Sequence, residues 1–272
     1  MNTFSEDEFD RCHSEEFRQN VAELIKNLSD RLVRVQLVIA GVASNLTELL
    51  EHIPSIQRNI FALQVPWMPP AEIRQLVKNG GELCGLTFED VAEDTIVSAA
   101  HGSPYLATLL GHHAGLSALD DQRVRVGRGD VLSAITSAAQ EFLGRMSGRA
   151  RSQLKAYASG DKMSDLGIVA GASLQSNGTF RLEDLRTPMV SADGLRRCEE
   201  LVADLVRAGL LVENDVEEGR VYWFAEDGFA PYLWLLSIEA KLRETKAPVP
   251  APIGVNFTPL QAGKTELSRP VS

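Results

Sequence analysis

Residues 6–28 run EDEFDRCHSEEFRQNVAELIKNL and place two adjacent carboxylates, Asp7 and Glu8, directly before a segment with helical periodicity. Charged residues separate the apolar positions of this segment, which are Phe17, Val21, Leu24, Ile25 and Leu28. That spacing puts one apolar stripe on an otherwise solvated helix. The stretch therefore predicts a carboxylate pair followed by an amphipathic helix that packs through one face.

The segment that follows changes to a strand pattern. Residues 31–45, RLVRVQLVIAGVASN, become wholly apolar toward their end, which is typical of a strand buried on both faces. Residues 46–59 predict a short helix that stops before Pro54, and residues 60–66, IFALQVP, predict a second short buried strand. The alternation of helix and strand indicates an α/β sheet of parallel strands.

Helical patterns replace this alternation from Pro69 onward. Residues 69–85 have Pro early and Gly late, residues 87–102 open with a Thr87 cap, and residues 103–119 complete a small helical module. A polar, Arg-bearing link, DDQRVRVGRGD, occupies residues 120–130.

The remaining residues predict a second domain. Helices are expected over residues 131–146, 150–158, 163–172 and 192–208. Residues 209–228, GLLVENDVEEGRVYWFAEDG, predict a hairpin around an acidic turn, and residues 230–244 predict a closing helix. Helices followed by a two-stranded wing favour a winged helix. The Pro-rich residues 246–272 are expected to be disordered.

Composition excludes several classes of protein. A net charge of −10 and a pI near 5.1 weigh against strong sequence-independent binding of nucleic acid. Cys12, Cys84 and Cys198 are scattered, without the spacing of a zinc site or a disulfide framework, which favours a reducing cytoplasm. The N-terminal residues lack the features of a signal peptide, and no window approaches the length of a membrane span. We expect a cytoplasmic protein with no membrane partner.

The order of these features resembles the back half of the ATPase module in the AAA+ and STAND class of P-loop NTPases. In such proteins a carboxylate that ends a buried strand holds Mg²⁺, and a second one orients or deprotonates the attacking water. The resemblance implies that Asp7 is the Mg²⁺ ligand of a Walker B motif and that Glu8 acts on the water. It also implies that Ser44 and Asn45 occupy the sensor 1 position, near the γ-phosphate.

The resemblance continues through the later elements. Arg58, in SIQRN, stands where such proteins often have an arginine finger that serves a neighbouring subunit. The helical module resembles the lid, and HGSPYLATLLG resembles the G-x-P stretch of STAND-type lids, which implies that Gly102 and Pro104 border the nucleotide. The segment GRVYWFAEDGFAPYLWLL is similar to the wing and closing helix of Orc/Cdc6-like ATPases.

Two features depart from the family pattern. Residues 2–6, NTFSE, stand where the family has apolar strand residues, and no G-x-x-x-x-G-K-[ST] motif occurs in the 272 residues. GKTELS, from Gly263, lacks the upstream Gly and lies in the tail. We therefore expect a truncated or mis-started product of a longer ATPase, or a chain whose partner supplies the P-loop half. Its apolar strand edges would then pair with another chain.

The expected fold is mostly α. It combines an α/β P-loop NTPase remnant, with Walker B, sensor 1 and following strands, a helical lid, a link, a winged-helix domain and a disordered tail. The corresponding ranges are residues 1–66, 67–119, 120–130, 131–245 and 246–272. The resemblance implies ATP and Mg²⁺ in the complete protein, neither bound tightly by this chain alone. Hydrolysis is expected only when an upstream P-loop half completes it, and the expected partners are other protein subunits.

Simpler interpretations stand beside each assignment. Asp7 and Glu8 also suit an acidic cluster that complements a helix dipole, and Arg58 suits an ordinary surface. Ser44 and Asn45 also suit a helix cap, and Gly102 and Pro104 also suit an ordinary loop before a helix. In the alternative, the chain is a non-catalytic winged-helix protein with a DNA-binding or regulatory function. Acidic residues in the wing and in residues 192–208 make DNA binding weak, whereas a cluster of basic residues near the link favours it; these are Arg123, Arg125, Arg128, Arg145, Arg149, Arg151 and Lys155.

Overall fold

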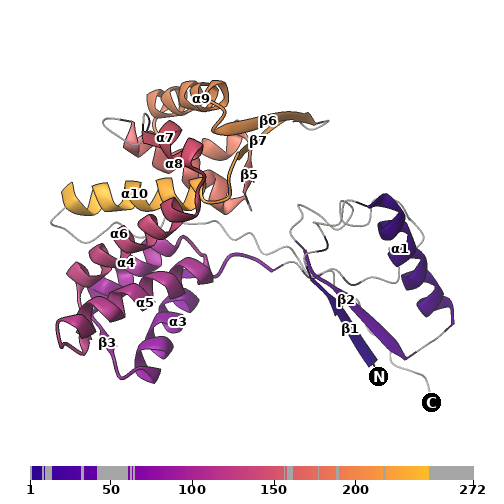
Figure 1. Ribbon diagram of the computed structural model, residues 1–272, viewed down its shortest axis with the longest axis horizontal. Helices are drawn as coiled ribbons and strands as arrows, with labels where there is room; N and C mark the ends of the chain where they lie inside the picture. Colours follow the sequence, from indigo (N-terminus) through magenta and orange to yellow (C-terminus); the bar gives the residue numbers. More distant parts are fainter. Residues whose placement is uncertain are drawn as a thin grey trace, which may run out of the picture.

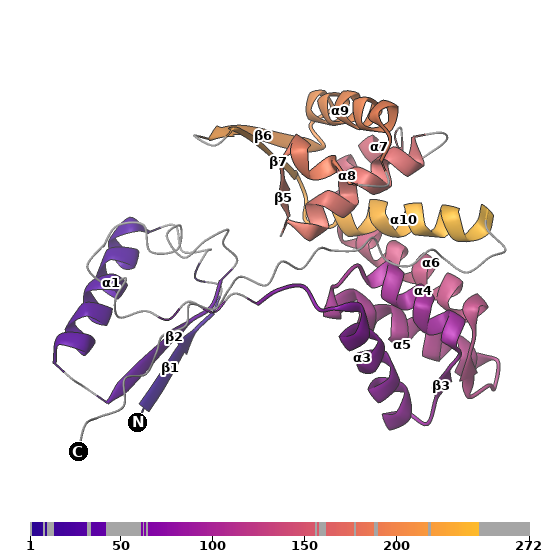
Figure 2. The same ribbon diagram turned by 180° about the vertical axis from the view of Figure 1, so that it is seen from behind.

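The computed structural model describes residues 2–7, 9, 14–31, 34–41, 61, 63, 65–155, 157, 162–176, 178–187, 190–216 and 219–244. A small unit of two strands and a helix lies beside a larger, mainly helical part, and an extended link, of which residues 61, 63 and 65–69 are described, joins them (Figure 1). The view from behind shows the same division (Figure 2). We call these parts the N-terminal unit and the helical body. None of the helices within the described ranges is long and apolar enough to cross a membrane.

The N-terminal unit is a β–α–β arrangement of β1 (Asn2–Glu6), α1 (Glu15–Asp30) and β2 (Val35–Ile39). The strands pair in parallel, with Phe4 opposite Leu37. The Ser14 side chain caps α1 by accepting a hydrogen bond from the Phe17 amide at 3.2 Å. The predicted helix and the parallel pairing are therefore confirmed, and the polar residues 2–6 do form a strand. The apolar stripe of the helix is not fully buried, because Phe17 and Leu24 are exposed.

Two expectations for the apolar segments are wrong. The residues of β2 alternate between half-buried and exposed, so this strand is not buried on both faces. Residues 61, 63, 65 and 66 are not in a strand, and the side chains of Phe61, Leu63 and Val65 are 88%, 77% and 84% exposed. An apolar segment becomes a buried strand only when neighbouring elements cover it and pair with its backbone. No such cover is present within the residues that the structure describes.

The first half of the helical body contains α3 (Pro70–Leu83), α4 (Asp90–Ala100), α5 (Pro104–Asp120) and α6 (Arg128–Arg145). Two short parallel strands, β3 (Thr87–Phe88) and β4 (Arg125–Val126), join the chain before α4 to the chain before α6. Thr87 is therefore not a helix cap, because its amide donates to the Val124 carbonyl at 2.9 Å and α4 begins three residues later. The segment expected as a link thus contains β4.

The second half of the helical body continues with α7 (Gly148–Lys155), α8 (Met163–Gln175), the 3-10 helix η3 (Leu182–Leu185) and α9 (Ala192–Arg207). The strands β5 (Thr179–Phe180), β6 (Leu211–Val216) and β7 (Gly219–Phe224) form an antiparallel sheet in the order β5-β7-β6. The hairpin and the closing helix, α10 (Phe229–Glu244), confirm two expectations from the sequence.

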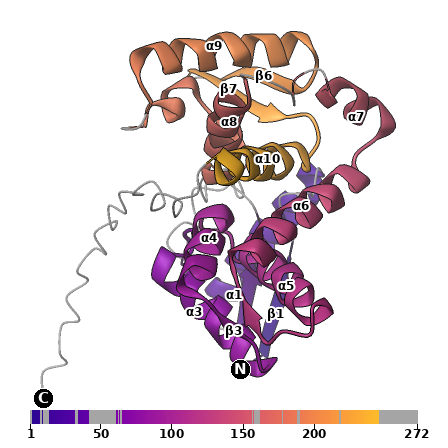
Figure 3. The same ribbon diagram turned by 90° about the vertical axis from the view of Figure 1, so that its left-hand side faces the viewer.

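Helix α10 joins the two halves of the helical body. It lies between α6 and α4 on one side and α8 on the other (Figure 3). A helix enclosed in this way must be apolar on most of its faces, and Leu233, Leu235 and Ile238 are fully buried. The approach to α8 is close, because a Cβ atom on Gly167 would lie 2.5 Å from the Ser237 Cβ. One hydrophobic core consequently runs from α3 to α10.

Candidate functional site

Asp7 follows β1 directly, at the end of the sheet where both parallel strands finish. The Phe9 amide donates to the carbonyl of Ala40, just beyond β2, at 3.0 Å, which holds the two strand ends together. The Phe9 ring is buried and lies 6.3 Å from the ring of Phe17 in α1. Open parallel sheets bind their ligands at this edge, so Asp7 stands where a metal-binding carboxylate would be expected.

The other residues assigned to catalysis are not placed. Glu8, Ser44, Asn45 and Arg58 lie outside the described residues. Asp7 is exposed. Within the described ranges, no group of three or more His, Cys, Asp or Glu side chains could hold a metal ion. The Mg²⁺ site at Asp7 therefore stays a prediction.

The Gly102 turn connects α4 to α5 and has a backbone that favours glycine. Gly102 has φ +79°, and His101 before it has φ 50°, so two successive residues are left-handed. A Cβ on Gly102 would lie 3.1 Å from the Cβ of Trp67. Ser103 then caps α5 by accepting a hydrogen bond from the Leu106 amide at 3.2 Å, and Pro104 is the first residue of that helix. The turn is thus packed against the link as well as starting α5.

The link meets the helical body at this same turn. The Met68 amide donates to the Gly102 carbonyl at 3.0 Å. The indole Nε1 of Trp67 donates to the Gln175 carbonyl, at the end of α8, at 2.8 Å. Asp7 and Gly102 are therefore in different parts of the molecule, and the chain between them is attached to the Gly102 turn by Trp67 and Met68.

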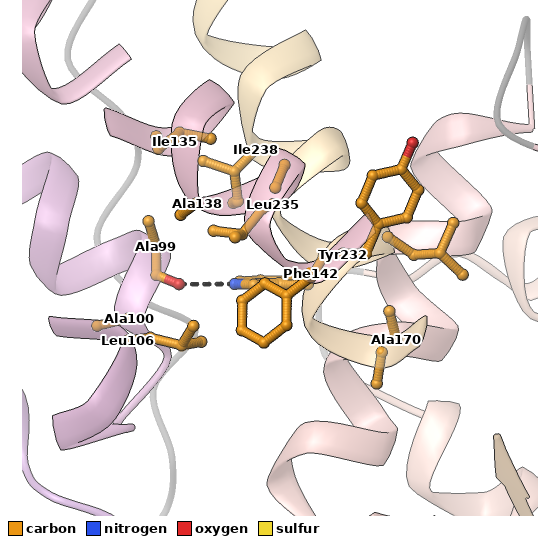
Figure 4. Close-up of a cluster of buried hydrophobic side chains, with 14 of the residues drawn as sticks. Ala99, Ala100, Leu106, Ile135, Ala138, Phe142, Ala170, Tyr232, Leu235 and Ile238 are labelled. Atoms are coloured by element: carbon orange, nitrogen blue, oxygen red, sulfur yellow. Dashed lines mark hydrogen bonds between the residues drawn. The ribbon is translucent and has the colours of Figure 1, made fainter. Parts of the chain in front are cut away.

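A second indole lies behind the turn. Trp234 of α10 donates from Nε1 to the Ala99 carbonyl at 2.8 Å, which is the dashed line in Figure 4. Its ring centroid is 4.4 Å from that of His101. A Cβ on Gly171 of α8 would lie 3.1 Å from the Trp234 ring, so glycine lets α8 approach. Trp234 of α10 therefore contacts both α8 and the carboxyl end of α4.

His101 is enclosed at this meeting point. Burial lowers the pKa of its imidazole to about 4, because the charged form would lose its hydration. The backbone of Gly171 acts in the opposite direction, and the Nε2 atom has no hydrogen-bond partner among the described residues. His101 is therefore neutral at physiological pH and packs as a flat, mainly apolar ring.

The sequence assigned Gly102 and Pro104 but missed Trp67 and His101. Trp234 is buried and packs in the core. One signal was available: WMPP places a large aromatic residue two positions before the prolines that open α3. A tryptophan at the end of an exposed link needs a partner for its ring and its N–H group.

Carboxylates neutralise several basic residues of the expected wing and of α9. Arg197 Nε lies 3.0 Å from the Asp165 carboxylate, and Arg220 Nε lies 2.8 Å from that of Asp215. Arg207 pairs with Asp204. Charges that are already paired contribute little to binding phosphates, because moving to a new partner gives up the old one.

Several residues of the basic cluster around the expected link, residues 120–130, are also paired with carboxylates. Arg123, Arg125 and Arg145 form ion pairs with carboxylates of the helical body. Arg149 and Arg151 are exposed on α7. The cluster is therefore smaller in effect than its sequence suggests.

Comparison with known proteins gives structural likenesses at low identity. No protein-family model matches the chain, and no curated protein matches its sequence. The Holliday junction branch migration motor RuvB of Thermotoga maritima is 19% identical with a TM-score of 0.45, and the match covers 90% of this chain and 70% of that one.

Two further solved structures belong to the same AAA+ class of P-loop ATPases. Orc2 of Aeropyrum pernix, in ADPNP-ADP complexes, is 18% identical with a TM-score of 0.44, over 89% of this chain and 66% of that one. Cdc6p of Pyrobaculum aerophilum is 11% identical with a TM-score of 0.41, over 89% and 66%. At these identities and TM-scores, the function proposed below rests on this chain's own residues.

Proposed function

We propose that the chain is the C-terminal portion of an AAA+-like ATPase, in which hydrolysis of ATP is coupled to a change of conformation or assembly. One observation carries the proposal: Asp7 directly follows β1, and β1 pairs in parallel with β2 across α1. This gives a carboxylate at the ligand-binding edge of a parallel sheet, where Walker B residues act. Asp7 would hold Mg²⁺, and Glu8 would orient the attacking water.

The Gly102 turn supports a second part of the proposal. It starts α5, and the helix dipole places partial positive charge at this N-terminus, which suits an anionic group, although the Leu106 amide bonds to Ser103 and Pro104 has no N–H. It is also attached to the link that leads back to the sheet, through the 3.0 Å bond from Met68 to Gly102. In the proposal Gly102 and Pro104 border the nucleotide, and α3 to α5 form the lid.

We further propose that the second half of the helical body is a winged-helix domain with a packing or regulatory role, and that it does not recognise DNA. The order α8, β5, η3, α9, β6, β7 is that of a winged helix, with α9 before a two-stranded wing. The ion pairs of Arg197, Arg207 and Arg220 oppose phosphate binding at the usual DNA-facing elements. In gel-shift experiments at physiological salt, duplex DNA should remain unshifted; a salt-dependent shift would favour the DNA-binding alternative.

The ATPase proposal is tested on protein that also contains a P-loop half, because the 272 residues contain no such motif. The first step is to translate the DNA before the Met1 codon in frame and look for a strand followed by G-x-x-x-x-G-K-[ST]. If it is there, phosphate release from MgATP is measured for the longer protein. Glu8→Gln should lower turnover by about 10²-fold or more, the scale of losing a general base. Asp7→Asn should raise the Mg²⁺ concentration needed.

A matched control is Asp30→Asn, at the exposed end of α1, which should leave turnover unchanged. Turnover that is insensitive to both Asp7→Asn and Glu8→Gln would contradict the Walker B assignment. The chain by itself should release no phosphate. If it does, and an Asp7→Asn, Glu8→Gln double variant abolishes the release, the requirement for a P-loop half is wrong.

A further inference from the structure

We propose that Trp67 is a latch that fixes the link onto the helical body, and that the helical body turns as one rigid piece about Val65 and Pro66. This inference concerns the mechanics of the chain and does not depend on ATP. It follows from three observations: the continuity of the core, the contacts of Trp67, and the change in exposure along the link.

The helical body is built to move as one piece. Helix α10 packs on α6 and α4 as well as on α8, so one continuous core runs through both halves. Trp234 adds a hydrogen bond from α10 to the end of α4, and the Gly167 and Gly171 contacts leave no space between α8 and α10. Rotation of one half against the other would open this packing and expose a buried indole N–H group.

Trp67 belongs to this rigid piece although it precedes its first helix. Its indole bonds to Gln175 at the end of α8, and its Cβ lies against the Gly102 turn. The neighbouring Met68 amide bonds to Gly102. The link is therefore held at the same time by the turn between α4 and α5 and by α8, which are elements of the two halves.

The attachment stops abruptly on the N-terminal side of Trp67. Val65 is exposed, as are Leu63 and Phe61, whereas Trp67 and Met68 are half-buried. Few contacts restrain the backbone where exposure is that high, and local mobility follows the density of contacts. The pivot is thus at Val65 and Pro66, and any displacement of the Gly102 turn moves the latch that sets the direction of the link.

The first experiment measures nuclear magnetic relaxation on the full chain labelled with ¹⁵N. Amides of α5 and α9 should give one common correlation time, and amides of β1 and β2 a different one. Different values for α5 and α9, or one value for all four elements, would overturn the rigid piece or the pivot. This measurement uses the unmodified protein, so it does not depend on a variant that folds.

The second experiment tests the latch with Trp67→Phe, which keeps a ring but removes the indole donor. The reporter is hydrogen exchange of the Met68 amide, whose bond to Gly102 depends on the latch. Exchange should be faster by about fivefold, the factor expected for losing one hydrogen bond. Exchange of the indole N–H of Trp234, inside the rigid piece, should stay unchanged.

Trp223→Phe is the matched control, because Trp223 is a half-buried residue of β7 whose indole has no hydrogen bond within the described part of the chain. It should leave Met68 exchange as in the unmodified protein. If Trp67→Phe also leaves it unchanged, or if both variants accelerate it equally, Trp67 is not the latch.

Discussion

Replacing Asp130 with asparagine should destabilise the helical body measurably at neutral pH. The Asp130 side chain is 5% exposed and accepts two hydrogen bonds from Arg123, at 2.7 and 2.9 Å. Ser117 Oγ and the Gly127 amide each donate to it at 2.9 Å. These groups tie the start of α6 to α5 and to the loop between them. The substitution Asp130→Asn would keep the shape of the side chain but remove the charge that all four donors favour.

The size of the effect follows from the pKa of this carboxyl. Hydrogen bonding to Arg123, with help from Gly127 and Ser117, lowers the pKa from 3.8 to about 2 although burial opposes it. A shift of that size corresponds to roughly 2 kcal/mol. Because the Arg123 side chain is 42% exposed, water screens part of the interaction, and we expect a loss of about 1–2 kcal/mol. The melting temperature should fall by about 2–4 °C for each kcal/mol.

The pH dependence distinguishes this account from a simple packing defect. A depressed pKa gives stability that is present above about pH 4 and is lost as the pH falls toward 2. Urea unfolding at a series of pH values should therefore show a steeper loss in the unmodified protein than in Asp130→Asn. Asp121→Asn, which removes an exposed partner of the same Arg123, serves as the control and should have little effect. Equal slopes for Asp130→Asn and the unmodified protein would refute the reasoning.

Three further predictions concern the helical body. Gly167→Ala should lower the free energy of unfolding by about 1–3 kcal/mol in urea titrations, because its Cβ would overlap Ser237; no change would mean that α8 and α10 can separate freely. Stability should fall as the pH drops from 6.5 toward 4, where His101 with its pKa of about 4 stays neutral only when folded, and acid melting curves of His101→Asn should be flatter over that range. Iodoacetamide should label the exposed Cys84 in the native protein but not Cys198, whose pKa burial raises to about 11; mass mapping of labelled Cys198 before unfolding would contradict its burial.

Local patterns predicted most of the elements. The stripe from Phe17 to Leu28 fixed α1, because charged residues between apolar ones leave a helix only one face to bury. The acidic hairpin and the apolar closing helix were also clear from composition, and both are present as β6, β7 and α10. In each case the deciding contacts lie within the element or beside it.

The failures arose where distant residues decide. Residues 60–66 have the composition of a buried strand, yet an apolar segment alone does not supply the neighbour that a strand requires. Thr87 does not cap a helix because it pairs with β4, which lies in the chain after α5. The bond from Trp67 to Gln175 joins residues 108 positions apart. No local pattern could indicate that pairing, although a tryptophan at this position does indicate that its ring and N–H group have some partner.

The free edge of β6 has a consequence for how the protein behaves at high concentration. This strand ends its sheet, and Val212 and Val216 on one of its faces are exposed. Exposed edge strands recruit further strands and so begin aggregation. Glu213 and Asp215 project from the opposite face, held by Arg220. Two carboxylates against one guanidinium leave this strand with a net negative charge, which would repel the same strand of an approaching copy and so oppose edge-to-edge pairing.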